Sequence, residues 1–96
     1  MKPSTALEHH REDIRRLVAN HRAANARVFG SVLKGADQDN SDLDLLVDPL
    51  PGATLLDLGS LQMELEETLG VPVDLRTPGD LPAGYRTSIL DDARPV

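Results

Sequence analysis

The sequence predicts a small domain of the α+β class, in which a three-stranded mixed sheet is flanked by about four helices. Two observations lead to this prediction. Segments with helical periodicity alternate with short apolar runs typical of strands, and glycine and proline separate these segments. The chain has 96 residues, close to the lower end of the roughly 100–200 residues usual for one domain. We therefore expect residues 1–96 to form a single domain with one core and one site.

The first half of the chain contains two predicted elements and a glycine-bounded turn. A helix is expected over about residues 5–22, because a capping-box pattern opens it at Thr5 and apolar residues follow at helical spacing. A short strand is expected over residues 26–29. Glycines bracket residues 30–35, which should form a turn with one helical turn, and a polar loop should follow over residues 37–41.

The second half contains the remaining strands and helices. Alternating apolar residues predict a strand over residues 43–48. Thr54 is expected to cap a long helix, which ends before Gly70 in the position of a C-terminal cap. A third strand is expected over residues 71–75, where a proline either places it at an edge of the sheet or limits it to a few residues. Asp80 is expected to cap the last helix. The long helix should pack through Leu55, Leu58, Gln62, Leu65 and Leu69. The last helix should carry Leu81, Tyr85, Ile89 and Leu90, with Tyr85 as a packing residue.

Composition excludes several classes of protein. Ten Lys and Arg against 16 Asp and Glu give a net charge of −6, which argues against a broad nucleic-acid surface or attachment to an anionic membrane. The first ten residues lack the apolar core of a secretory signal, and no apolar run approaches the roughly 20 residues that span a bilayer. Cysteine is absent, which excludes disulfides, thiolate zinc sites and a cysteine nucleophile. We expect a cytoplasmic protein without direct nucleic-acid or membrane contacts.

An acidic segment in the middle of the chain is the first candidate site. Residues 37–48 contain five Asp and no Lys or Arg, which in the simplest interpretation is a solvated loop followed by a strand with one wet face. Asp42 and Asp44 are two positions apart on the predicted strand, so both side chains should point to the same face. Two such carboxylates need a cation between them, or one must take up a proton. Oxygen ligands of this kind select Mg²⁺, Mn²⁺ or Ca²⁺.

A calcium-binding loop is an alternative interpretation of the same segment. Residues 37–41 match the opening of an EF-hand. The sixth position, which should be glycine, is Asp42, and the twelfth, which should be glutamate, is Asp48. The missing glycine removes the sharp turn that the calcium loop needs, so the comparison argues against calcium.

A glycine-containing turn lies just before the acidic segment. Gly30 and Ser31 follow a predicted strand and open a short helical turn, where free backbone N–H groups suit a phosphate. Ser31 adds a hydroxyl group, and Lys34 lies about one helical turn further on. The simpler alternative is a strand-to-helix turn capped by Ser31. Neither a Walker A loop nor a Rossmann fingerprint is present, and the turn followed by paired Asp residues describes a Mg²⁺–triphosphate site.

These motifs together resemble the G-S-x-x-x-G-x(5)-S-D-x-D-L signature of the DNA polymerase β-like nucleotidyltransferases. The matching residues are Gly30, Ser31, Gly35, Ser41, Asp42, Asp44 and Leu45. Within that superfamily the chain is similar to the minimal nucleotidyltransferases, and the resemblance extends over most of its length. Such proteins are often paired with a HEPN-domain partner in bacterial and archaeal toxin–antitoxin modules.

The resemblance implies a role for each matching residue. Asp42 and Asp44 would bind two Mg²⁺ ions, with Mn²⁺ as an alternative, and Asp74 would complete one metal site and help deprotonate the attacking hydroxyl. The nucleotide-binding residues would be Gly30, Ser31, Lys34, Gly35 and Ser41. Many relatives have arginine at the position of Lys34, which keeps the charge but loses the bidentate fork. Other titratable residues match no family position. We interpret Asp37, Asp39 and Asp48 as solvated charges, and His9, His10 and His21 as surface or packing residues.

The resemblance also implies a reaction and a partner. The expected reaction is in-line attack of a hydroxyl on the α-phosphorus of ATP, assisted by Mg²⁺. Our leading hypothesis is an antitoxin that transfers AMP to a tyrosine of a HEPN-domain RNase toxin within a hetero-oligomer, because the chain has no second domain to hold an acceptor. The alternative is a binding-only antitoxin that masks the toxin without catalysis.

Overall fold

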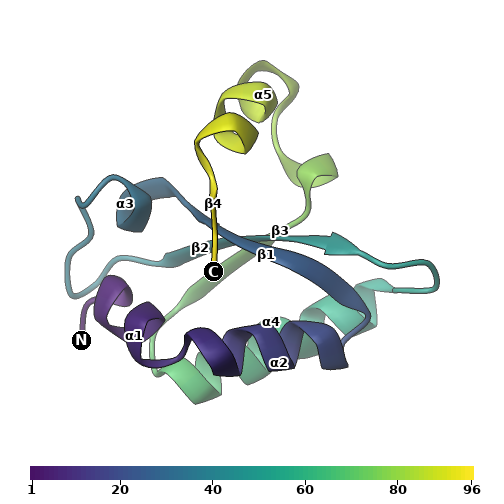
Figure 1. Ribbon diagram of the computed structural model, residues 1–96, viewed down its shortest axis with the longest axis horizontal. Coiled ribbons are helices and arrows are strands. Elements are labelled where there is room, and N and C mark those ends of the chain that lie inside the picture. The colour runs from purple at the N-terminus through teal and green to yellow at the C-terminus, as the bar shows by residue number, and fades with distance from the viewer.

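The protein is described here by a computed structural model covering residues 1–96. A four-stranded mixed sheet lies between a thick layer of helices and a thin one (Figure 1). The strands are, in sheet order, β3 (Val73–Arg76), β2 (Leu43–Pro49), β1 (Ala23–Phe29) and β4 (Arg94–Pro95). β1 is antiparallel to β2 and β4, whereas β2 is parallel to β3. The predicted α+β class with a mixed sheet and an edge strand β3 is confirmed, and β4 is a fourth strand that the sequence did not reveal.

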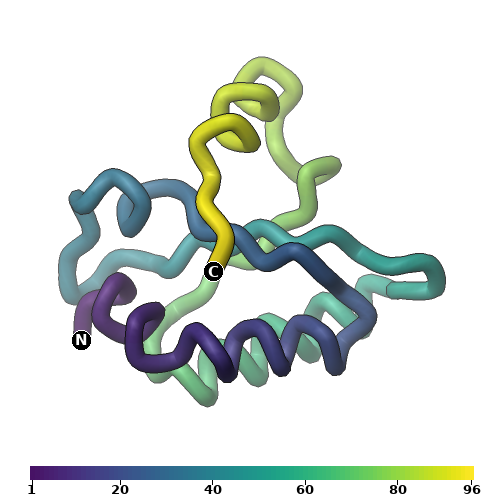
Figure 2. The backbone as a smooth tube through the Cα atoms, in the orientation of Figure 1, coloured from purple at the N-terminus to yellow at the C-terminus, as the bar shows by residue number.

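The thick layer covers one face of the sheet with three helices. These are α1 (Pro3–His9), α2 (Arg11–Asn20) and α4 (Leu55–Leu69), which run beneath the strands in the orientation of Figure 2. The main hydrophobic core lies between these helices and the sheet. Its fully buried members include Ile14, Leu43, Leu45, Leu61 and Leu65. Because alternate residues of a strand point to opposite faces, the Asp residues of β2 point away from this core.

The other face of the sheet is covered only in part. The short helix η1 (Pro78–Asp80) and α5 (Ala83–Asp92) lie on this side, over a cluster formed by Phe29, Leu46, Leu81 and Ala93. No residue of α5 is buried, and the helix α3 (Gly30–Leu33) sits beside it at the end of β1. This thin layer leaves part of the sheet face available for a site.

The single N-terminal helix predicted over residues 5–22 is wrong, because the chain breaks at His10, where φ is −130°. The predicted cap at Thr5 is also wrong, since α1 begins at Pro3 and Thr5 lies within it. Asp37, 33 residues away, accepts a hydrogen bond of 2.9 Å from the Ser4 backbone N–H through Oδ2. Asp37, which is remote in the sequence, therefore caps the first turn of α1 in place of a neighbouring residue.

Two acidic residues that were interpreted as solvated accept hydrogen bonds in the structure. Asp37 is only 8% exposed because of its position against α1. Asp48 accepts hydrogen bonds from Arg27 at 3.0 Å and from Asn25 at 2.9 Å. The prediction of free loop charges is wrong for both, and Asp39 is exposed as expected.

The long helix α4 has the predicted ends and buries most of the predicted face, including Leu65 and Leu69. Thr54 forms a capping box with Asp57, and Gly70 follows the helix in a left-handed conformation. Leu55, expected in the core, is 86% exposed, and Leu61 is buried. Leu61 therefore extends the predicted face, and only the predicted burial of Leu55 is wrong.

The C-terminal region differs from prediction in two further details. Asp80 caps η1 together with Thr77, and α5 begins later, after Pro82. Tyr85, expected to pack, is 66% exposed. None of the helices combines the length and the apolar character needed to cross a bilayer.

Candidate active site

The turn between β1 and α3 brings the chain against a carboxylate on the neighbouring strand. Phe29 and Asp44 are register partners in the antiparallel pair β1–β2, so Gly30 follows directly over Asp44. Gly30 has φ of +74°, and a Cβ added to it would lie 2.9 Å from Asp44 Cγ and closer still to Oδ2. Only glycine fits this position, both because of its backbone conformation and because of the carboxylate beneath it.

Two carboxylates from adjacent strands face the same side of the sheet. Asp44 on β2 and Asp74 on β3 are direct register partners, and both are partly buried. Asp42 is exposed and lies just before the first residue of β2. The predicted neighbours Asp42 and Asp44 thus gain Asp74 as a third acidic residue through strand pairing.

This arrangement raises the pKa of Asp44. Burial of the carboxyl group, followed by the negative charges of Asp74 and Asp42, raises the pKa of Asp44 from 3.8 to about 6. Arg76 and the Ser31 backbone N–H act in the opposite direction and do not compensate. Asp44 is therefore a carboxylate that lacks sufficient positive charge nearby.

Arg76 lies beside these carboxylates and was not among the residues predicted from the sequence. Its Nε donates a hydrogen bond of 3.1 Å to Asp74 Oδ1, and this contact raises the pKa of Arg76. The signal in the sequence is the spacing of two between Asp74 and Arg76, which places both on the same face of a strand. The predicted strand ended at residue 75 and therefore left Arg76 out.

The acidic group suits a divalent cation in donor type and in charge. Its ligand atoms are carboxylate oxygens, which Mg²⁺ prefers, and three Asp side chains face a single arginine. The side chains are not gathered into a ready-made group of three metal ligands. Asp74 instead forms an ion pair with Arg76.

A cleft of about 340 Å³ opens beside Gly30, between α3 and α5. Helix α3 contributes Gly30, Leu33 and Lys34, and α5 contributes Tyr85, Ser88 and Asp92. The exposed Tyr85 therefore borders the turn expected to bind phosphate.

The remaining predicted nucleotide-binding residues lie at the margin of the site. Gly35 ends the turn after α3 and has open space around it. Ser41 Oγ accepts a hydrogen bond of 2.9 Å from the Gln38 backbone N–H, so it shapes the loop that leads into β2.

Comparison with known proteins agrees with these motifs. The chain matches the family model of the nucleotidyltransferase domain over residues 7–96. It is 36% identical over 77 residues to a "putative protein adenylyltransferase" of Methanocaldococcus jannaschii, which covers 80% of this chain and 83% of the relative. It is 38% identical over 63 residues to the "protein adenylyltransferase MntA" of Thermococcus cleftensis, which covers 66% of this chain and 64% of the relative.

Solved structures show the same fold. A "putative minimal nucleotidyltransferase" superposes with a TM-score of 0.87 at 43% identity, covering all of this chain and 97% of the other. A "toxin-antitoxin with AMP-PNP" superposes with a TM-score of 0.73 at 20% identity, covering 88% of this chain and 69% of the other, and so supports the fold alone. From the family match over residues 7–96 and the relative with 36% identity, the chain belongs to the nucleotidyltransferase family.

Proposed function

We propose that this nucleotidyltransferase transfers AMP from ATP to a tyrosine of a HEPN-domain RNase toxin and thereby acts as its antitoxin, in a Mg²⁺-dependent reaction. The observation that carries the proposal is Asp44, held under Gly30 and opposite Asp74, where it lacks a compensating cation. The names of two similar proteins, both protein adenylyltransferases, support the choice of an adenine nucleotide and of a protein acceptor.

The nucleotide would bind with its phosphates at the turn of Gly30 and Ser31. The absence of a side chain at Gly30 leaves room for the Asp44 carboxylate beside the turn, Ser31 offers a hydroxyl group, and Lys34 adds a positive charge at the adjoining cleft. Gly35 and Ser41 would hold the ends of the loop between α3 and β2 in place.

Asp74 would act on the acceptor. The tyrosine oxygen attacks the α-phosphorus, the new O–P bond forms as the bond to pyrophosphate breaks, and the phenolic proton passes to the Asp74 carboxylate. Arg76 would orient Asp74 through its hydrogen bond of 3.1 Å. Mg²⁺ bound by Asp42, Asp44 and Asp74 would supply charge neutralisation at the phosphates and lower the pKa of the attacking hydroxyl.

The test follows the mass of the acceptor. A HEPN-domain RNase, the proposed acceptor, is mixed with this chain, ATP and Mg²⁺, and its intact mass and RNase activity are measured. We expect a gain of one or more AMP units on tyrosine and a loss of RNase activity. The double substitution Asp42→Asn with Asp44→Asn should abolish the mass gain, while the control Asp39→Asn, in the exposed loop, should retain it.

Two outcomes would contradict the proposal. Transfer that survives in the double variant would exclude Asp42 and Asp44 from the site. Inhibition of the RNase without ATP and without any change of mass would instead establish the binding-only antitoxin.

A further inference from the structure

The outward face of α4 is exposed and apolar although the helix is well formed. Leu55, Leu56 and Met63 are 86%, 83% and 63% exposed, respectively. The capping box at Thr54 defines the start of the helix, so the two leucines belong to its first turn. Leu50, in the preceding loop, is also exposed. Large exposed apolar side chains that lie together are typical of surfaces that bind another protein.

Gly59 lies in the middle of this face and is exposed. Glycine in a helix interior lowers helix stability relative to alanine. A Cβ added at Gly59 would meet no atom within 4 Å, so packing within this protein does not require glycine there. Gly59 and the exposed Ser60 follow Leu56 by three and four positions and precede Met63, so the four residues share one stripe of the helix. Small residues between larger ones allow the backbone of a second helix to approach closely.

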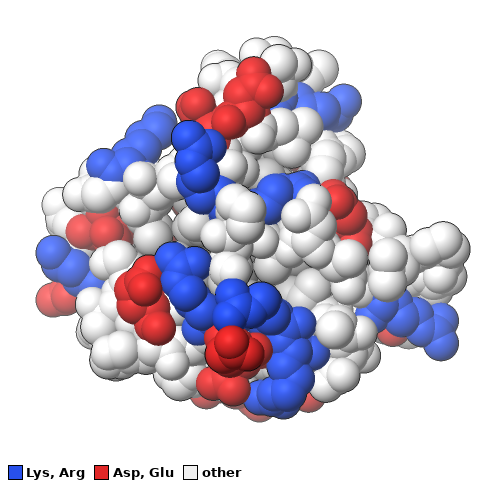
Figure 3. All heavy atoms as spheres, viewed as in Figure 1, with Lys and Arg blue, Asp and Glu red and all other residues white.

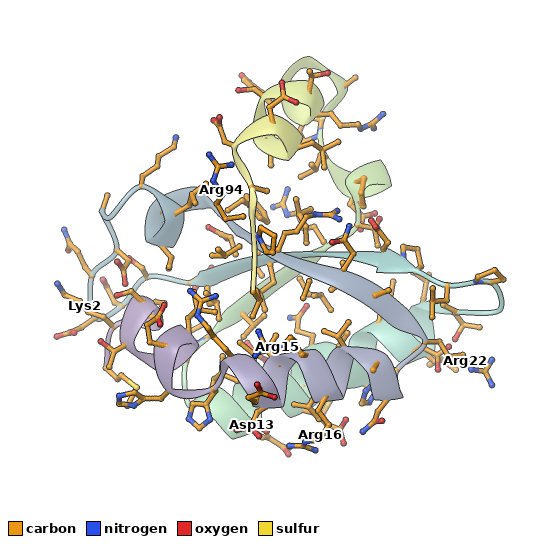
Figure 4. All side chains as sticks on the ribbon, viewed as in Figure 1. Lys2, Asp13, Arg15, Arg16, Arg22 and Arg94 are labelled. Carbon is orange, nitrogen blue, oxygen red and sulfur yellow. The ribbon has the colours of Figure 1, made fainter.

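The charge of α4 selects the kind of partner. The helix contains Asp57, Glu64, Glu66 and Glu67 and no Lys or Arg. On α1 and α2, in contrast, each arginine is paired with an acidic residue three positions before it, as for Arg15 with Glu12 and Arg16 with Asp13. These mixed charges gather over α2 in Figure 3, and Figure 4 shows the labelled Asp13, Arg15 and Arg16 on that helix.

A second copy of this chain is a poor occupant of the α4 face. Glu64 is paired with His21, Glu66 accepts a hydrogen bond from the Val73 N–H and Asp57 belongs to the capping box, so Glu67 is the acidic residue on the exposed stripe. Two α4 helices side by side would bring the two copies of Glu67 together, and neither helix carries a Lys or Arg. The whole chain, moreover, carries a net charge of −6. Like charges across an interface are unfavourable, so the α4 face suits a partner with positive charge.

We propose that the α4 face, defined by Leu55, Leu56, Gly59, Ser60 and Met63, is the docking surface for a basic amphipathic helix of the acceptor protein. This inference rests on the proposed function for the identity of the partner. The α4 face belongs to the helical layer opposite the carboxylates, so docking and AMP transfer involve different surfaces. Binding through α4 is therefore independent of ATP and of Asp42 and Asp44.

The experiment uses Gly59→Leu, which fills the open space on the helix. Because leucine is a better helix former than glycine, this variant should unfold at a temperature equal to or above that of the parent, yet bind the acceptor protein at least about tenfold more weakly. Leu56→Glu should weaken binding as well, by adding charge and removing apolar contact. Gly84→Leu on α5 is the matched control, because a Cβ there also meets nothing within 4 Å, and its affinity should stay within about twofold of the parent. Affinities are measured by calorimetry without ATP.

The outcomes separate this inference from the proposed function. Unchanged affinity in both α4 variants, or no complex with the parent, overturns the docking surface. The same holds if light scattering shows a dimer of this chain that Gly59→Leu dissociates. If the parent binds through α4 but transfers no AMP, the docking surface stands and the transfer reaction fails. If both α4 variants bind and transfer like the parent, the reaction stands and the docking surface fails.

Discussion

The Asp44 carboxylate fills the space that a side chain at residue 30 would need. This contact makes the glycine a requirement of the site as well as of the turn. Gly35 provides the comparison, because its φ of +69° is equally unfavourable for other residues but its surroundings are open. The difference between the two glycines therefore isolates the effect of the carboxylate.

We expect Gly30→Ala to lower the free energy of unfolding by about 1–3 kcal/mol more than Gly35→Ala, since only the former adds overpacking to the backbone strain. Urea unfolding of both variants measures this difference. Equal losses would mean that the carboxylate of Asp44 moves aside at no cost, and that Gly30 serves the turn alone.

The raised pKa of Asp44 predicts a specific pH dependence of stability. A carboxyl group whose pKa is about 6 in the folded protein and 3.8 otherwise favours folding only while protonated. Its contribution is fully present below about pH 4 and is lost as the pH rises through about 6. In metal-free protein, Asp44→Asn should match the parent below about pH 4 and be more stable above about pH 6.

Asp48→Asn serves as a control, because the expected pH dependence of its effect on stability has the opposite sign. Hydrogen bonds from Arg27, and then from Asn25, lower the pKa of Asp48, so its contribution is present at neutral pH and is lost in acid. Asp48→Asn should therefore be less stable than the parent near pH 7, and the difference should shrink as the pH falls. Urea midpoints between pH 3 and 8, measured with a chelator, test both. An offset for Asp44→Asn that does not change with pH would contradict the assignment.

At the scale of elements, the start of α1 depends on the loop that leads into the site. The Ser4 N–H donates to Asp37, and this hydrogen bond lowers the pKa of Asp37. The loop of residues 37–41 is therefore attached to the helical layer on one side and continues into Asp42 on the other. An element far from the carboxylates thus helps to position the approach to them.

Asp37→Ala should lower the urea midpoint at pH 7, because the first turn of α1 loses its acceptor. The control Asp39→Ala removes an exposed charge from the same loop and should leave the midpoint unchanged. Since the pKa of Asp37 is lowered in the folded protein, its contribution is present above its ordinary pKa and is lost as the pH falls. The two variants should therefore converge in acid, and a difference that persists there would contradict the capping role.

At the scale of the whole molecule, the two faces of the sheet have different tasks. The face covered by α1, α2 and α4 holds the main core, which keeps β2 and β3 in register. The thinly covered face holds Asp44, Asp74 and the cleft beside α5. This division lets the chain combine a stable core with an open site, and it leaves the outward side of α4 available for a partner.

The sequence by itself determined the parts of the protein that depend on near neighbours. The cap at Thr54 and the end of α4 at Gly70 involve residues three to four positions apart, so the pattern of near neighbours was enough to predict both. The order of the central elements and the spacing from Gly30 to Asp44 also follow from local patterns, which is why the nucleotidyltransferase signature was visible.

Only the tertiary structure decided the features that join distant segments. The strand β4 exists because Arg94 pairs with Val28, and Asp37 caps α1 across 33 residues. Leu55 was assigned to the core because hydropathy does not show which side of a helix a sheet covers. These contacts depend on chain segments brought together by folding, and their energies do not appear in any local pattern.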